Sequence, residues 1–189
     1  MTLRLSACIL ALLITGCGDP PNKEMDQAQG AIDAARAAGA DRYAATEYTA
    51  ATDALKRAQD DVAQRDYRQA LNEALDSREH AQNAAREAAD TKAQVRGEVE
   101  RDMAQIAALI AQANTRLAAA TKRRASRRVL DGPRSELAAV DDRVQKAGEA
   151  MKADDYLSAR AALQGVKERI QQAMRALEPP ASQSSRRRR

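Results

Sequence analysis

Apolar residues recur every three or four positions over most of the chain, and this spacing predicts amphipathic α-helices. The predicted helices span about residues 22–38, 46–64, 67–124, 133–152 and 156–177. We therefore expect an all-α fold. It would consist of elongated antiparallel helical hairpins, resembling a helical bundle or coiled coil, with one long central helix.

Residues that favour helix ends mark several of the expected boundaries. Asn22, Asp66 and Asp155 precede three of the helices and are expected to cap them. The run Asp131-Gly132-Pro133 predicts a turn that starts the fourth helix at Pro133, because proline suits the first helical position.

The central helix is predicted to be long because no proline interrupts residues 67–132. A continuous helix from Tyr67 to about Arg124 would measure ~85 Å at 1.5 Å per residue. Gly97 costs about 1 kcal/mol relative to alanine, so a bend or break there is the alternative. The stripe expected to face the core is Tyr67, Leu71, Ala74, Ala81, Ala85, Ala88, Val95, Val99, Met103, Ile106, Ile110, Ala113, Leu117 and Ala120.

An internal repeat relates residues 46–70 to residues 135–159. The clearest match aligns Asp66-Tyr67-Arg68-Gln69-Ala70 with Asp155-Tyr156-Leu157-Ser158-Ala159. In each copy a helix ends, an aspartate caps, and a second helix begins with Tyr-x-x-Ala, so we expect one helical hairpin used twice. The turn is similar to the turn inside tetratricopeptide repeats, although the long segment between the copies departs from their short period.

A second resemblance covers under half of the chain, from about Glu24 to Val95. It rests on Ala28, Ile32, Ala35, Ala38-Gly39-Ala40, Tyr43-Ala44, Glu47, Leu55, Ala58, Asp66-Tyr67, Ala70 and Ala74. The stretch resembles the alanine-rich bacterial lipoprotein domain of unknown function, family 4398. This resemblance implies no activity, because that family is itself uncharacterised.

The first 17 residues have the layout of a secretory signal: Arg4, an apolar core of about ten residues, then Thr15-Gly16-Cys17. The end of this stretch resembles the lipobox of bacterial lipoproteins. That resemblance implies removal of residues 1–16 and acylation of Cys17, which would hold the chain on a membrane. An ordinary signal peptide cleaved nearby is the alternative. Gly18 in place of aspartate favours the outer membrane over the inner one.

Composition narrows the fold further. The chain has no tryptophan or phenylalanine and only four tyrosines, and alanine dominates. Alanine buries little area but has the best helix propensity, so we expect close-packed helices around a thin core. Removal of the leader would leave Cys17 as the remaining cysteine, which excludes a disulfide framework.

Charge is concentrated in two basic clusters. The net charge of +4 falls to about −1 for residues 17–185 when Arg4 and the four terminal arginines are subtracted. The clusters are Lys122, Arg123, Arg124, Arg127 and Arg128, and the tail Arg186, Arg187, Arg188 and Arg189. Export disfavours nucleic acid as the partner and leaves lipid phosphates, lipopolysaccharide or wall carboxylates. The alternatives are that the terminal arginines only increase solubility, and that the first cluster stabilises the C-terminus of a helix through its dipole.

Candidate catalytic chemistry is sparse. His80 is the single histidine and has no evident second ligand or nucleophile beside it. The acidic pairs Asp60-Asp61, Asp141-Asp142 and Asp154-Asp155 are explained by solvated helix faces and caps, because adjacent helix residues do not face one another. We expect no metal, no cofactor and no enzyme activity.

These observations predict a non-catalytic, lipid-anchored helical spacer or adaptor that faces the periplasm and contacts another envelope protein. Binding of an envelope polymer or anionic lipid through the basic clusters is the alternative, and a homo-oligomer stays open. The expected organisation is a signal peptide (1–16), a spacer (17–21), an N-terminal helical region (22–125), a C-terminal hairpin (126–178) and a disordered basic tail (179–189).

Overall fold

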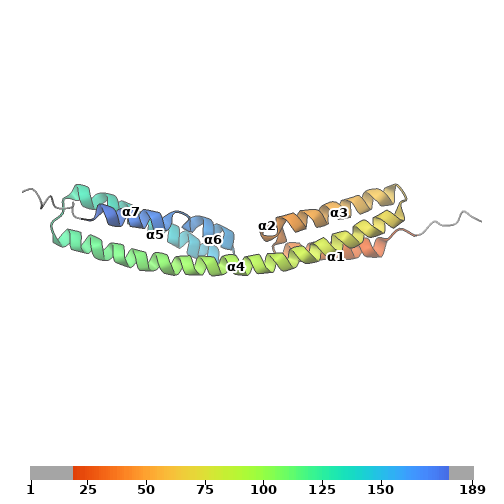
Figure 1. The fold of residues 1–189 in the computed structure, drawn as a ribbon, viewed down its shortest axis with the longest axis horizontal. Coiled ribbons are helices and arrows are strands. Elements are labelled where there is room, and N and C mark those ends of the chain that lie inside the picture. Colours follow the sequence, from red (N-terminus) through yellow and green to blue (C-terminus); the bar gives the residue numbers. More distant parts are fainter. Residues whose placement is uncertain (1–18, 179–189) are drawn as a thin grey trace, which may run out of the picture. The chain divides into compact units, whose positions relative to one another are not determined.

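The computed structural model describes residues 19–178, and these residues form helices and no strands (Figure 1). The all-α fold class is therefore confirmed over this range. The helices are α1 (Asn22–Ala37), α2 (Ala40–Tyr43), α3 (Ala45–Ala63), α4 (Tyr67–Lys122), α5 (Arg127–Lys152), α6 (Tyr156–Leu163) and α7 (Val166–Ala176).

The chain divides into two compact units within α4: the first unit extends to Thr91 and the second begins at Lys92. Helices α1, α2, α3 and the start of α4 form the first unit, where α1 and α3 pack side by side (Figure 1). The rest of α4 forms the second unit together with α5, α6 and α7, and α5 packs along both α6 and α7. The N-terminal helical region predicted for residues 22–125 thus contains the helices of the first unit and also the part of α4 that belongs to the second unit.

Helix α4 is continuous over 56 residues and passes through Gly97 without a break, as the absence of proline predicts. Its buried face differs from the predicted stripe in the first unit. The buried residues there are Ala70, Ala74, Ser77, Ala81, Ala84 and Ala88, whereas Leu71 is 36% exposed. The prediction of Leu71 as a core residue was wrong because alanines occur on several faces of this segment, so spacing alone does not select one.

The repeat predicted from the sequence appears as the same turn in both units. Asp66 Oδ1 accepts a hydrogen bond from the Gln69 amide at 3.1 Å, and Asp155 Oδ1 accepts one from the Ser158 amide at 3.2 Å. Both predicted caps are therefore confirmed, because each aspartate satisfies an amide of the following helix that has no intrahelical partner.

A left-handed residue precedes each capping aspartate. Arg65 has φ +62° and Asp154 has φ +56°, and each closes a Schellman motif at the end of the preceding helix. A third turn of the same kind joins α4 to α5, with Arg124 at φ +58°. The sequence does not predict these turns, because none of them has the glycine that normally occupies the left-handed position after a helix.

Two predicted helix starts were wrong. Asn22 is the first residue of α1 and does not cap it; Pro21 holds that position. Helix α5 begins at Arg127 and passes through Pro133, which is buried. Because proline has no N–H, the carbonyl of Val129 lacks its usual donor four residues later. The first turn of α5 is instead held by packing, since Leu130 is only 6% exposed and contacts Ala120 and Leu177.

The last predicted helix, residues 156–177, is two helices separated at Gln164 and Gly165. Gln164 has an extended backbone, and Gly165 has φ +74°, a conformation that side chains disfavour. Arg143 of α5 donates to the exposed carbonyl of Ala162 at 3.1 Å and so satisfies part of the end of α6. The sequence did not predict this break, because the helical spacing of apolar residues continues across it from Leu163 to Val166.

A basic end of the second unit as a candidate anionic-surface site

The turn from α4 to α5 gathers the five predicted basic residues within a few positions of one another. Lys122 is the last residue of α4, Arg123 and Arg124 lie in the turn that follows, and Arg127 and Arg128 begin α5. All five side chains are exposed. Within residues 19–178, we find no ion pair for any of them. The turn therefore carries uncompensated positive charge.

Two of these charges occupy an unfavourable position for the fold. The N-terminus of a helix carries partial positive charge, so cations there cost about 0.3–1 kcal/mol each. Arg127 and Arg128 are the first two residues of α5, and the first turn of α5 has no acidic residue. The helix dipole favours Lys122 at the end of α4 but opposes Arg127 and Arg128, so helix stability does not account for this pair.

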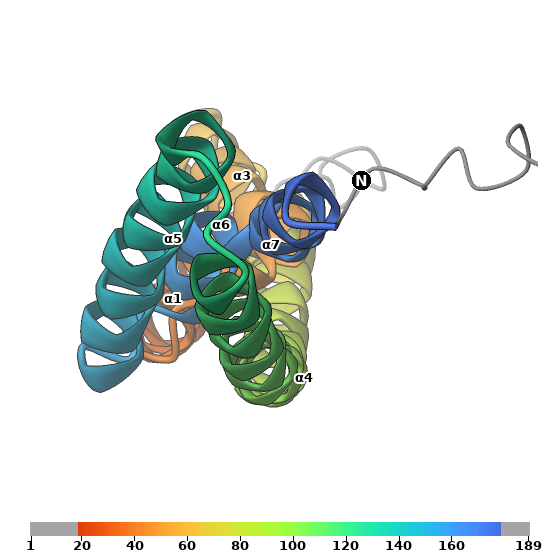
Figure 2. The same ribbon diagram turned by 90° about the vertical axis from the view of Figure 1, so that its left-hand side faces the viewer.

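The end of α7 lies beside this turn (Figure 2). Arg123 Nη2 donates to the carbonyl of Leu177 at 3.3 Å, and Arg116 Nη1 lies 2.7 Å from Glu178 Oε1. Leu177 also packs with Ala120 and Leu130 in a small apolar cluster beneath the turn. We call Lys122, Arg123, Arg124, Arg127, Arg128 and Val129 the basic tip.

The other predicted site residues lie outside the described residues: Cys17, Arg186, Arg187, Arg188 and Arg189. The described chain ends at Glu178, next to the basic tip. In the sequence, Arg186 follows Glu178 by eight positions.

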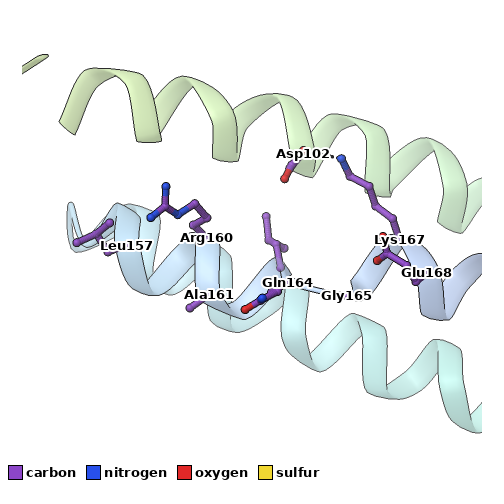
Figure 3. Close-up of a pocket in the computed structure, with 9 residues that line it drawn as sticks. Asp102, Leu157, Arg160, Ala161, Gln164, Gly165, Lys167 and Glu168 are labelled. Carbon is purple, nitrogen blue, oxygen red and sulfur yellow. Dashed lines mark hydrogen bonds and ion pairs between the residues drawn. The ribbon is translucent and has the colours of Figure 1, made fainter. Parts of the chain in front are cut away.

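A groove of about 560 Å³ opens where the α6–α7 break faces α4 (Figure 3). Lys167 Nζ lies 2.5 Å from Asp102 Oδ1 and donates to Gln105 at 2.7 Å, and Arg160 lies 3.6 Å from Glu98. These pairs join α6 and α7 to α4 across the groove. Gln164 and Glu168 are the other polar residues that line the groove.

Also in the second unit, the pKa of Arg96 is raised above its ordinary value because Glu100 Oε1 accepts a hydrogen bond from Nε at 2.8 Å. The negative charge of Glu100 adds to the effect. Both side chains are on the surface, so the pair contributes little to stability.

His80 lies in the first unit, where its Nδ1 is 2.7 Å from Glu47 Oε2. The two side chains join α4 to α3, which is a structural contact the sequence did not reveal. Across residues 19–178, no three His, Cys, Asp or Glu side chains gather in a way that could hold a metal ion. No helix in the same range has the length and apolarity needed to cross a membrane.

The fold defines an all-α protein built from helical bundles. Residues 23–98 match the family model of a domain of unknown function, DUF4398, which confirms the resemblance predicted for Glu24 to Val95. The match covers the helices of the first unit and the next turns of α4. No curated protein and no solved structure matches the chain. Acylation of Cys17 and the similarity to the tetratricopeptide turn stay predictions.

Proposed function

We propose that the chain is a lipid-anchored, non-catalytic spacer or adaptor of the bacterial cell envelope that faces the periplasm, with the outer membrane favoured. The observation that carries this proposal is the position of Cys17, at the end of a signal-like core and a few residues before α1 begins at Asn22. Acylation there would place the first unit directly at a membrane surface. The contact of His80 with Glu47 joins α4 to α3 and so supports a structural role for the single histidine.

Metabolic labelling with a fatty-acid probe tests the anchor, with Cys17→Ser compared to the parent chain. We expect label on the parent only, and the labelled protein in the membrane fraction. Equal labelling of both chains, or an unprocessed chain in the cytosol, would remove the basis of the proposal.

An adaptor also needs a surface for its protein partner. Leu71 and Leu75 are 36% and 37% exposed and lie one helical turn apart on α4. A photo-crosslinking residue at Leu75 should capture an envelope protein, whereas the same residue at exposed Gln82 serves as the control. Capture of lipid alone at Leu75 would contradict the adaptor role.

A second candidate function is binding of an envelope polymer or anionic lipid through the arginine clusters. The specific observation in its favour is that the turn from α4 to α5 brings five exposed cations together. It predicts salt-sensitive binding to isolated walls, lipopolysaccharide or lipid. Removal of Arg186–Arg189 together with neutralisation of Arg123, Arg124, Arg127 and Arg128 should abolish this binding.

A further inference from the structure

Val129 is an apolar side chain exposed within the basic tip. It is 40% exposed, and it directly follows Arg127 and Arg128 in the first turn of α5. Its neighbour Leu130 points inward and is only 6% exposed. The helix therefore presents one aliphatic side chain outward among several cations.

We infer that the basic tip is a contact for a phospholipid membrane rich in anionic headgroups, in which the arginines bind phosphates and Val129 enters the apolar boundary below them. This inference refines the second candidate function and depends on it. A lipid interface matches both properties of the tip, because it offers negative charge at its surface and apolar chains just beneath. A soluble or wall polymer would match the charge alone.

The basic tip lowers the stability of the first turn of α5, and this supports a role in binding. Arg127 and Arg128 oppose the dipole of α5, and Pro133 removes one of the hydrogen bonds that would secure the first turn. Contact with an anionic surface compensates the first of these costs.

Vesicle binding tests the inference with the chain from residue 17 carrying Cys17→Ser, so that no acyl group binds the vesicle. We expect salt-sensitive binding to phosphatidylcholine vesicles containing phosphatidylglycerol and none to phosphatidylcholine alone. The combined variant Arg124→Gln, Arg127→Gln and Arg128→Gln should bind about a hundredfold more weakly, since each cation near such a surface contributes about fivefold.

The matched control is Lys23→Gln, Lys56→Gln and Arg68→Gln, which removes the same charge from exposed positions of the first unit. It should lower affinity by less than about tenfold, as expected for charges outside the contact. Equal losses in the two variants would show a general charge effect and would overturn the inference. Circular dichroism should show both variants folded, and the tip variant should melt no lower than the parent because it relieves the dipole of α5.

The apolar part of the inference has its own readout. The chain contains no tryptophan, so Val129→Trp introduces a single tryptophan, at the tip. Its emission should shift to the blue with anionic vesicles and be quenched by lipid-borne quenchers, whereas Leu71→Trp in the first unit should show neither effect. Val129→Leu, which adds one methylene, should bind about fourfold more tightly than the parent.

The outcomes separate the inference from the function on which it rests. Unchanged emission of the Val129→Trp variant on bound vesicles would overturn membrane insertion. Salt-sensitive binding to wall fragments or lipopolysaccharide, with no binding to the vesicles, would keep the second candidate function and exclude the phospholipid. Absence of salt-sensitive binding to all three surfaces would exclude both.

Discussion

The two units each combine part of α4 with three other helices but fill their cores differently. The first unit buries mainly alanine, with Ile32, Tyr43 and Leu55 as its larger core residues. The second unit buries branched aliphatic residues, and Ile106, Val140 and Ile170 are fully covered there. The part of the chain that matches the domain of unknown function is the alanine-rich one.

This difference shows that a unit of packed helices can be stabilised in two ways. Alanine buries little apolar area, so the first unit depends more on helix propensity and on close approach of its helices. Ser77 illustrates the close packing: it is fully buried, and its hydroxyl donates to the carbonyl of Ala51 at 2.8 Å. The second unit depends on burial of large side chains. The units should therefore respond in opposite ways to a change of side-chain volume.

Truncation of the aliphatic core should give the largest effect. Ile106 is fully buried in the second unit, and Ile106→Ala should lower the free energy of unfolding by about 2–5 kcal/mol, because it removes apolar contacts and leaves a cavity. Urea unfolding followed by circular dichroism measures the loss. Hydrogen exchange should show that α5 and α7 lose protection while α1 and α3 keep most of theirs. Equal loss in all four helices would show that the two units unfold together.

Enlargement of the alanine core should come next. Ala81 is fully buried against Ala28, Ile32 and Ala51, so Ala81→Leu should destabilise the first unit by about 1–3 kcal/mol through overpacking. The control is Ala89→Leu on an exposed position of the same helix, which should change stability little. If Ala81→Leu is as stable as its control in urea unfolding, the helices of the first unit are not closely packed.

The sequence predicted the features that depend on local preference. Helix spacing and the absence of proline were sufficient for the continuous α4, and the aspartate that precedes a helix was sufficient for the caps at Asp66 and Asp155. The features it missed depend on tertiary contacts. Pro133 resembles a helix start, but packing of Leu130 extends α5 further toward its N-terminus, to Arg127.

The candidate site was also predicted only in part. The run of basic residues from Lys122 to Arg128 is evident in the sequence, as is its positive charge. Its division between the end of one helix and the start of the next was not evident, because the turn at Arg124 lacks glycine. The contact of Arg123 with Leu177 joins residues far apart in the chain, and helical periodicity contains no information about such a pair.

A smaller effect is expected at Gly97, in the part of α4 that belongs to the second unit. A Cβ at this position would lie 3.6 Å from the Arg101 guanidinium, which is ordinary van der Waals contact. Gly97→Ala should therefore stabilise the second unit by about 1 kcal/mol through helix propensity alone. Thermal melting measures the gain. A loss of stability would indicate that glycine is needed there for a reason other than space.

The smallest and most specific difference concerns the repeated turn. Arg65 and Asp154 hold the same left-handed position, which glycine adopts without strain. Arg65→Gly should stabilise the first unit by about 1 kcal/mol. Asp154→Gly should gain less, because Asp154 Oδ1 accepts a hydrogen bond from the Tyr156 hydroxyl at 2.5 Å that the variant loses. Comparison of Asp154→Gly in the parent and in Tyr156→Phe isolates this contribution. Equal gains at Arg65 and Asp154 in the parent would mean that the hydrogen bond adds nothing, and that the two turns differ in sequence but not in stability.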